Sequence, residues 1–446
     1  MSELFATSRR NFITGSATAA FGLALSSAAV KQAEAKQRDI ALSQPPHFEG
    51  FGSGSIDESY WSKVRAQFTL SPDLIFLNNG TLGPVPNPVL QTRSYYNHLL
   101  ASDPTNSFRA KELDEVRKQI AQFINAQPGE VSITRSTTEG LNILSHAIDW
   151  KQGDEVILGD QENHAAVEPY QTLSERYGIK IVTVPLPVPA QSVDEIVSAY
   201  AKAFTPRTRV LVVSHVSYAT GLIAPLKELA TLAHQHGALI CVDGAQSLGV
   251  LPIDVAATDI DHYAAAGQKW LLAGTGTGVN FIRKDLQGKL WPLFGYDDPR
   301  SARQAVRYEH SGQIDIASAI GIGTAIQFQN AVGRKNIEDR ARTINKHFQE
   351  GSKSIPGVKL LSSSNPALAA NISVFTVPNL PAVQTARLLE EQNHISVKGF
   401  VHRDITALRV STHFYNTFNQ IDQLLSVVAK WSKDPPAFAD RPSRPA

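Results

Sequence analysis

Lys269 is the side chain of this sequence whose surroundings best suit covalent chemistry. It lies in Gly267-Gln268-Lys269-Trp270, directly after a short apolar run at residues 262–265. A lysine between a glycine and a tryptophan is not typical of an amphipathic helix surface. An amine removed from water has a lowered pKa, so it can act as a nucleophile that forms a Schiff base and can then shuttle protons. We therefore expect Lys269 to be catalytic.

Asp243 ends another apolar run, at residues 238–242. A carboxylate is costly to bury at the end of a strand unless a cation pairs with it. The protonated nitrogen of a pyridine ring is such a cation. The aspartate would raise the pKa of that nitrogen and keep the ring an electron sink.

Two further turns allow both an ordinary and a functional interpretation. Thr137 and Thr138 open an expected helix, where hydroxyls commonly cap the N-terminus, but hydroxyls and free N–H groups there would also hold a phosphate. His164 follows the run at residues 155–158. A histidine in a loop is usually a polar surface residue, although its imidazole could stack on the face of a flat heteroaromatic cofactor.

Strands must position these residues, because each of them follows a short apolar run rich in β-branched residues. The runs predict strands at residues 74–77, 131–134, 155–158, 179–184, 209–214, 238–242, 262–265 and 278–282. Stretches with helical periodicity separate the runs, at residues 111–124, 139–148, 193–204 and 226–235. This alternation predicts an α/β fold with a mostly parallel sheet, whose ligands bind at the carboxyl ends of the strands.

The pattern changes after about residue 315 and predicts a second, smaller α+β domain. One long helix is expected at residues 316–350, followed by strand, helix, strand and helix. We therefore divide the chain into a leader (1–35), an N-terminal arm (36–85), a large domain that holds the cofactor (86–315), the long helix with the small domain (316–434) and a flexible tail (435–446).

Composition excludes several classes of protein. The 446 residues carry 42 basic and 41 acidic side chains, so no excess of positive charge suggests a nucleic-acid partner. Cys241 is the one cysteine, so the chain forms no internal disulfide and no cysteine-rich metal site. We expect no metal ligands.

The N-terminus has the features of an export signal. Arg9 and Arg10 precede a mildly apolar run at residues 12–30, and Ala33-Glu34-Ala35 resembles a small-x-small cleavage site. The run is too rich in small residues for a strong membrane anchor. Paired arginines are typical of the twin-arginine route, which exports folded proteins. We expect a periplasmic protein that engages the export machinery and has no stable membrane association.

These motifs together resemble the class V aminotransferase family of fold-type I pyridoxal-5′-phosphate (PLP) enzymes. The family includes cysteine desulfurases and isopenicillin-N epimerase. The resemblance covers about residues 76–423 and rests on LNNG at 77–80, RSTTEG at 135–140, NHA at 163–165, SHV at 214–216, DGAQ at 243–246, GQKWL at 267–271 and RVS at 409–411.

The resemblance implies a role for each matching residue. Lys269 would bind PLP covalently, Asp243 would pair with the pyridine nitrogen and Arg409 would clamp the substrate carboxylate in a bidentate fork. Asn79 would lie near the substrate. The remaining cofactor contacts would come from Thr137 and Thr138 at the phosphate, His164 on the ring, Gln246 near the phenolic oxygen, and Ser217, Tyr218, Gln268 and Gln313.

This chain departs from the family pattern at several positions. Tyr218 stands where many relatives have an asparagine, and Gln268 takes the place of a histidine after Ala266, where relatives often have a serine. Gln313 lies in a segment that relatives extend across a homodimer, where a threonine is common. The cysteine that desulfurases carry ahead of the C-terminal arginine is absent, so a cysteine desulfurase is not expected.

We expect aminotransferase-type chemistry on a small molecule or peptide that carries a free amino-acid group. Epimerisation, for which Tyr218 is a candidate second base, and C–S or β-elimination remain alternatives. A catalytically decayed binding protein is disfavoured, because Lys269, Asp243, His164 and Arg409 are all retained. Exported relatives of the epimerase branch modify the glutamate side group of peptide siderophores, so the resemblance suggests such a substrate.

Overall fold

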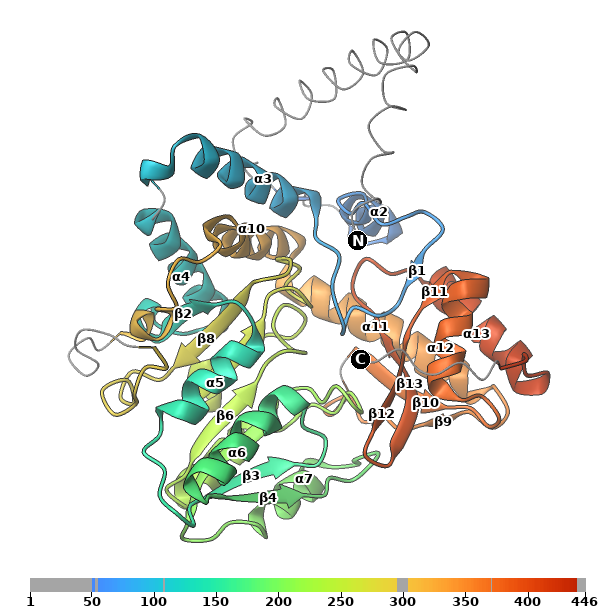
Figure 1. Cartoon of the computed structure of the whole chain (residues 1–446). Coiled ribbons are helices and arrows are strands. Elements are labelled where there is room, and N and C mark those ends of the chain that lie inside the picture. The colour runs from blue at the N-terminus through green and yellow to red at the C-terminus, as the bar shows by residue number, and fades with distance from the viewer. Residues whose placement is uncertain (1–49, 53–54, 107–108, 295–303, 370, 439–446) are drawn as a thin grey trace, which may run out of the picture.

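The computed structural model describes residues 50–438, apart from 53–54, 107–108, 295–303 and 370. The expected leader and the end of the tail therefore lie outside the described residues. A seven-stranded sheet forms the centre of the large domain (Figure 1). Its strands are β2 (Val131–Thr134), β3 (Glu155–Gly159), β4 (Lys180–Val184), β5 (Thr208–Ser214), β6 (Leu239–Asp243), β7 (His262–Ala266) and β8 (Gly278–Ile282).

The strand order is β2-β8-β7-β6-β5-β3-β4, and β8 alone runs antiparallel to its neighbours. The sheet is therefore mixed but mostly parallel, as the alternation of strands and helices predicts. Parallel neighbours end at the same edge, and their register pairs Ser214 with Asp243. The carboxyl ends of β5 and β6 thus bring two polar side chains together.

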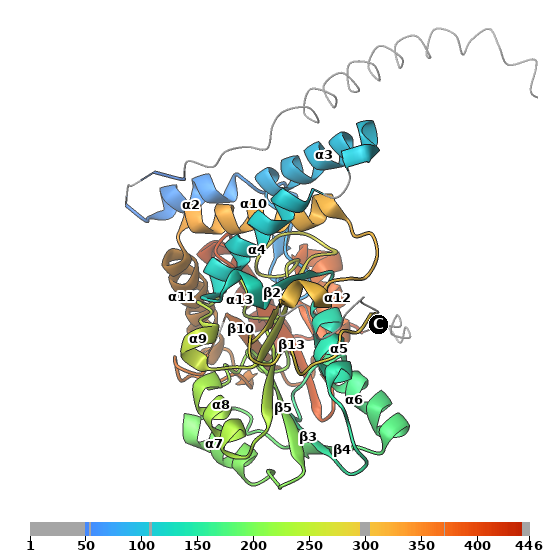
Figure 2. The ribbon, with the colours of Figure 1, turned by 90° about the vertical axis from the view of Figure 1, so that its left-hand side faces the viewer.

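Helices cover both faces of this sheet. Figure 2 shows α5 (Thr137–Ala147) and α6 (His164–Tyr177) on one side of the strands, with α7 (Val193–Ala201), α8 (Leu226–Gln235) and the short α9 (Val255–Thr258) on the other. Side-chain caps fix where several of these helices begin, because Ser136, Asn163 and Ser192 each accept a hydrogen bond from a backbone amide of the first turn.

Both faces of the central strands are buried. Val210 and Val212 pack in one hydrophobic cluster, and Leu211 and Val213 pack in another on the opposite face. Successive side chains of a strand point to opposite faces, so a continuous apolar run is what a strand between two layers of helices requires.

The prediction of one continuous helix at residues 316–350 is wrong. The segment consists of two helices, α10 (Ile316–Val332) and α11 (Arg334–Lys353), separated by Gly333 with φ of 91°. This positive φ favours glycine and ends the helical path. The helix α10 packs against α3 (Asn87–Ser102) and α4 (Ala110–Ile124), whereas α11 packs against the small domain. The break therefore separates a helix that packs against α3 and α4 from one that packs against the small domain.

The small domain is an antiparallel sheet of β9 (Lys359–Leu360), β10 (Ile372–Thr376), β12 (Lys398–His402) and β13 (Ile405–Ser411), covered by helices. Its helices are α11, α12 (Ala382–Asn393) and α13 (Phe418–Lys433). The arm carries α2 (Glu58–Arg65) and β1 (Ile75–Phe76), and β1 pairs with β11 (Ile395–Ser396). The arm thus joins the small domain, although the strand expected at residues 74–77 is reduced to two residues. Short 3₁₀ turns complete the described structure at Pro104–Asn106, Pro128–Glu130 and Ala305–Tyr308.

The predicted architecture, a mostly parallel sheet followed by a smaller α+β domain, is confirmed. No helix among the described residues has both the length and the apolar character needed to cross a membrane.

Candidate active site

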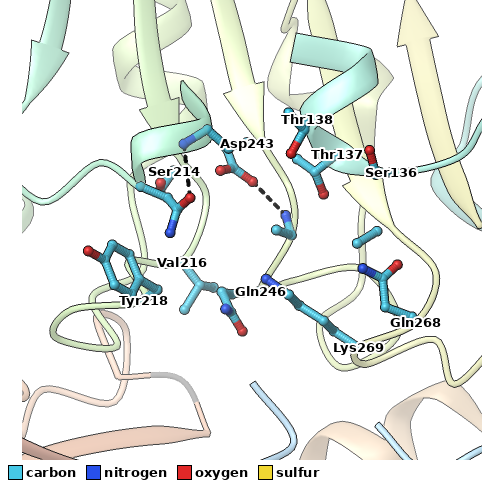
Figure 3. Close-up of a pocket in the computed structure, with 14 residues that line it drawn as sticks. Ser136, Thr137, Thr138, Ser214, Val216, Tyr218, Asp243, Gln246, Gln268 and Lys269 are labelled. Carbon is cyan, nitrogen blue, oxygen red and sulfur yellow. Dashed lines mark hydrogen bonds between the residues drawn. The ribbon is translucent and has the colours of Figure 1, made fainter. Parts of the chain in front are cut away.

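A cavity of about 90 Å³ lies at the carboxyl ends of the parallel strands. The lining residues come from the ends of β2, β3, β5, β6 and β7 or from the turns that follow them. Figure 3 shows their side chains converging. Lys269, Asp243, Thr137, Thr138 and Gln268 are among its lining residues. Segments that are far apart in the sequence therefore meet where the sequence predicts a ligand.

Lys269 reaches the cavity from the turn that follows β7. Its backbone carbonyl accepts a hydrogen bond from Asn79 Nδ2 at 3.2 Å, and the carbonyl of the preceding Gln268 accepts one from the amide of Gly83 at 2.8 Å. These contacts hold the turn against the arm. Burial lowers the pKa of the Lys269 amine to about 8; the nearby Arg409 acts in the same direction and Asp243 opposes it. An amine with this pKa is available as a nucleophile and a base near neutral pH.

Asp243 ends β6 with only 4% of its surface exposed. Its carboxylate accepts a hydrogen bond from the Ala245 amide at 2.8 Å, visible as a dashed line in Figure 3. Burial raises the pKa of the Asp243 carboxyl, although the Ala245 amide and Lys269 act against this rise. A carboxylate in this position is stabilised by a bound cation, which the protonated nitrogen of a pyridine ring would supply.

The N-terminus of α5 faces the same cavity. Ser136 caps the helix by accepting a hydrogen bond from the Glu139 amide at 3.2 Å. Within the described residues, the buried hydroxyl of Thr137 has no hydrogen-bond partner. The first-turn amides have no acceptor within the helix. Unsatisfied donors at a helix N-terminus fit a phosphate group, so the cavity fits PLP at its phosphate end as well as at Asp243.

Arg409 comes from β13 of the small domain and is 4% exposed. Its Nη2 donates to Thr81 Oγ1 at 2.9 Å, and its Nη1 donates to the carbonyl of Tyr218 at 3.4 Å. The buried Nε has no hydrogen-bond partner in the described part of the chain. Burial lowers the pKa of the Arg409 guanidinium to about 10, which still leaves it charged at neutral pH. A buried guanidinium with an unused donor is suited to a carboxylate ligand.

Tyr218 lines the cavity, but its hydroxyl is engaged elsewhere. Tyr218 Oη lies 2.6 Å from His402 Nδ1, and Figure 3 shows the hydroxyl turned away from Lys269. Burial raises the pKa of the phenol, whereas Arg409 lowers it. The geometry therefore does not favour Tyr218 as a second base at the substrate.

Three expected residues lie outside the lining of this cavity. His164 is exposed at the start of α6 and does not line the cavity; Asn163, the residue before it, does. The helix begins at His164 and its first turn points that side chain outward. Ser217 is buried but lies outside the lining, and its hydroxyl accepts a hydrogen bond from the Ala219 amide at 3.2 Å. Gln313 is exposed and does not reach the cavity of its own chain.

Two expected residues are engaged in contacts within the protein. Besides its bond to Lys269, Asn79 accepts a hydrogen bond from Tyr415 Oη at 2.9 Å. Gln246 lines the cavity, donates to the Gly80 carbonyl at 2.9 Å and accepts from Trp270 Nε1 at 2.8 Å. Both side chains therefore fix the walls around Lys269.

Glu162 is a residue that the sequence interpretation missed. It is buried behind the cavity and lies 2.5 Å from the hydroxyl of Ser214, which lines the cavity. Burial raises the pKa of Glu162 to about 8, and the neighbouring Asp243 adds to the rise. The carboxyl is thus neutral at pH 7. A charged residue in a turn suggests a surface position, so the sequence offered little signal for it.

Cys241 is buried inside β6, and burial raises the pKa of its thiol well above the usual range. It is therefore a core residue rather than a nucleophile. Among the described residues no cluster of histidine, cysteine, aspartate and glutamate suits a metal ion.

Comparison with known proteins supports the resemblance. The model of the family described as Aminotransferase class-V matches residues 75–424. The chain is 31% identical over 397 residues to an isopenicillin N epimerase from Amycolatopsis lactamdurans, which covers 84% of this chain and 99% of the relative. It is 29% identical over 394 residues to a probable cysteine desulfurase from Methanothermobacter thermautotrophicus, with coverage of 81% and 95%. The apo structure of a cysteine desulfurase from Thermococcus onnurineus superposes with a TM-score of 0.75 at 25% identity, covering 86% of this chain and 99% of that one.

Proposed function

The chain belongs to the class-V aminotransferase family, and from this premise we propose that it is a PLP-dependent enzyme acting on an amino group next to a carboxylate. The architecture is that of the fold-type I PLP enzymes. The observation that carries the proposal is the pair of buried charges in one cavity: Lys269, whose amine has its pKa lowered to about 8, and Asp243, which needs a cation.

Each end of the cofactor has a partner in the cavity. Lys269 would hold it covalently, and Asp243 would pair with its ring nitrogen. The hydroxyls of Thr137 and Thr138 and the side-chain Nε2 of Gln268 would donate to its phosphate together with the first turn of α5. When bound, PLP supplies an electron sink that lowers the barrier to breaking a bond at the substrate carbon bearing the amino group.

The protein supplies orientation and proton transfer. Arg409 binds the substrate carboxylate and so orients the carbon beside it toward Lys269. Lys269 Nζ then takes the proton from that carbon and returns a proton to another atom on the same face. Among the described residues that line the cavity, Lys269 is the one base free for this transfer, because Asp243 serves the ring and Tyr218 bonds His402. A single base on one face favours aminotransferase-type chemistry.

Epimerisation is the second candidate, because the relatives include isopenicillin N epimerases at 31% and 28% identity. It would require Lys269 or a water molecule to return the proton to the opposite face. C–S or β-elimination remains a further alternative, since relatives include cysteine desulfurases. A desulfurase that uses a cysteine nucleophile does not fit this chain, whose one cysteine is buried in β6.

We further propose that the substrate is an amino-acid group pendant on a larger periplasmic molecule, such as the glutamate side group of a peptide siderophore. The support is the leader-like N-terminus, with Arg9 and Arg10 ahead of its apolar run. Free amino acids give little reason to export a folded cofactor enzyme.

The test is product analysis by mass spectrometry in D₂O. Holoenzyme is incubated with a panel of L- and D-amino acids and peptides with pendant glutamate, with and without an added 2-oxo acid. Loss of the substrate amine together with amination of the 2-oxo acid supports the aminotransferase. Deuterium at the α-carbon with inverted configuration and a retained amine supports the epimerase. No conversion and no deuterium incorporation by holoenzyme, in excess of the Lys269→Ala control, would refute an enzyme acting at this carbon.

A further inference from the structure

His402 bonds two separate parts of the large domain from the end of the β12–β13 hairpin. Its Nε2 lies 2.8 Å from the carbonyl oxygen of Asp160, and its Nδ1 lies 2.6 Å from Tyr218 Oη. A carbonyl oxygen only accepts hydrogen bonds, so Nε2 carries the proton in the neutral ring. Nδ1 is then the acceptor, and the Tyr218 hydroxyl donates to it. Both ring nitrogens are satisfied in one fixed tautomer.

Tyr218 also contacts the other end of the same hairpin. Its carbonyl accepts a hydrogen bond from Arg409 Nη1 at 3.4 Å. In the hairpin register, His402 pairs with Ile405 at the turn, whereas Arg409 pairs with Lys398 at the far end. One residue of the large domain therefore bonds a small-domain hairpin at two points, through its hydroxyl and through its backbone.

The hairpin needs such an anchor, because its end is otherwise open to solvent. Val401 is 65% exposed, and Arg403 and Asp404 in the turn are exposed as well. The tilted rings of Tyr218 and Phe400, with centroids 6.1 Å apart, add an apolar contact at the same place. Tyr218 and Phe400 thus lie beside the hydrogen bonds of His402 where the two domains meet.

The position of this hairpin matters for the substrate, since the two domains supply different ends of the site. Lys269 belongs to the large domain and Arg409 to the small one. Bidentate recognition of a carboxylate depends on the orientation of the guanidinium plane, and displacement by about 1 Å can be costly in rate. Arg409 Nε, buried and without a partner in the described chain, is the donor that such displacement would misdirect.

We infer that His402 is a positioning residue for substrate recognition. Together, Asp160, His402 and Tyr218 form a clasp that holds the hairpin so that the Arg409 guanidinium faces a carboxylate whose neighbouring carbon lies at Lys269. The clasp affects binding of the substrate carboxylate, whereas Lys269 interacts with the amine end of the substrate. This inference rests on the proposed function, because it assumes that Arg409 binds the carboxylate.

Two matched probes separate binding of the substrate carboxylate from binding of its amine. L-Alanine and ethylamine differ by the carboxylate, and binding of each to the holoenzyme is followed by the change in visible absorbance of the cofactor. His402→Phe keeps a ring and loses both hydrogen bonds, His402→Asn keeps an acceptor near Nδ1, and Tyr218→Phe loses the hydroxyl alone. His347→Phe is the control, because His347 bonds Asp422 at 2.6 Å on the helices of the small domain.

We expect His402→Phe and Tyr218→Phe to reduce the preference for L-alanine over ethylamine about 3- to 10-fold, as one or two lost hydrogen bonds would. Ethylamine binding should stay unchanged in His402→Phe, His402→Asn should recover part of the preference, and His347→Phe should have no effect. Hydrogen exchange of the amides of residues 398–411 should be faster in the two clasp variants.

An unchanged preference in His402→Phe, or an equal loss for both probes, would overturn the role of His402 in carboxylate recognition. Unchanged hydrogen exchange in the hairpin would overturn the clasp itself. Equally tight binding of L-alanine and ethylamine by both the unaltered enzyme and Arg409→Lys would contradict the proposal that Arg409 binds the carboxylate. The hydrogen-exchange measurement then still decides whether the clasp exists, so the two failures are distinguishable.

Discussion

Lys269 and Asp243 owe their chemistry to burial as much as to residue type. Removal from water lowers the pKa of the amine to about 8 and raises that of the carboxyl. Each side chain also favours the charged form of the other. A bound pyridine ring with a protonated nitrogen gives Asp243 a cation in direct contact. Lys269 and Asp243 therefore have shifted pKa values before the cofactor binds.

Replacement of Asp243 tests the electronic part of this account. Asp243→Asn keeps the shape and can still accept the hydrogen bond from the Ala245 amide, but it cannot raise the pKa of the ring nitrogen. We expect turnover to fall on the order of 100-fold, with a much smaller loss of PLP occupancy. Single-turnover rates and cofactor content, measured on the same preparation, give the comparison. Near-normal turnover would mean that Asp243 is structural.

Glu162 leads to a prediction about stability and pH. Its pKa is raised to about 8 in the folded chain, from an ordinary value of 4.5. Between these pH values the folded state retains a proton that the unfolded state has lost, so this group makes the fold less stable as pH rises. The free energy of unfolding falls by at most about 1.4 kcal/mol per pH unit because of this group. Glu162→Gln stays neutral at all pH values and keeps the amide as a partner for Ser214.

The melting temperature of Glu162→Gln should therefore rise relative to the unaltered chain as pH increases from 5 to 8. Glu175→Gln, at an exposed position of α6, serves as the control and should show no such trend. A constant difference between Glu162→Gln and the unaltered chain across this range would contradict the neutral, buried carboxyl.

At the scale of single residues, the sequence predicted the charged groups better than their neighbours. Lys269 and Asp243 were recognisable because charged residues rarely follow buried strands without a function, whereas Arg409 came from the family resemblance alone. The residue before His164, Asn163, lines the cavity, and only the start of α6 reveals this. The bond between Tyr218 and His402 joins residues 184 positions apart, and one sequence contains no signal for it.

At the scale of elements, periodicity predicted the strands and most helices of the large domain. It did not separate α10 from α11, because apolar and helix-forming residues continue across Gly333 and only its φ of 91° interrupts them. The two-residue β1 was overestimated as well, since its pairing with β11 depends on a distant part of the chain. Local pattern thus gave the elements, and tertiary contacts decided where they end.

The role of the α5 N-terminus in binding the cofactor phosphate can be tested directly. Thr137 Oγ1 is buried without a partner in the described chain, so the hydroxyl gives the cofactor-free protein no stability. Thr137→Val keeps the shape of the side chain and removes the hydroxyl. We expect the apoenzyme to melt at the same or a higher temperature, while PLP dissociates about tenfold faster for want of one phosphate contact.

Thr138→Val provides the comparison for the neighbouring hydroxyl. If Thr137→Val lowers the melting temperature of the apoenzyme and leaves PLP release unchanged, the hydroxyl has a structural partner and no phosphate role.

At the scale of the whole molecule, the site is open to a contribution from a second chain. Gln313 is exposed and outside the cavity, in a segment that the family resemblance suggests reaches the partner's cofactor, and Ala266 gives the cavity no hydroxyl. We predict a homodimer with two-fold symmetry and an interface above ~2,000 Å². PLP occupancy should then fall as the dimer is diluted, because the phosphate loses donors.

Sedimentation mass and cofactor content across a dilution series provide the measurement. Gln313→Ala should shift the loss of PLP to a higher protein concentration. A monomer that retains PLP as firmly as the dimer would show that the phosphate site is closed within one chain.

The central claim, that Lys269 carries the cofactor, is tested most directly by borohydride reduction followed by peptide mass spectrometry. Reduction fixes a Schiff base as a stable amine, so the account predicts the added mass of reduced PLP on the peptide that contains Lys269. The same peptide from Lys269→Ala should be unmodified, and Lys284, exposed after β8, should carry no label in either protein. An unmodified Lys269 peptide from a yellow, reduced sample would contradict the account.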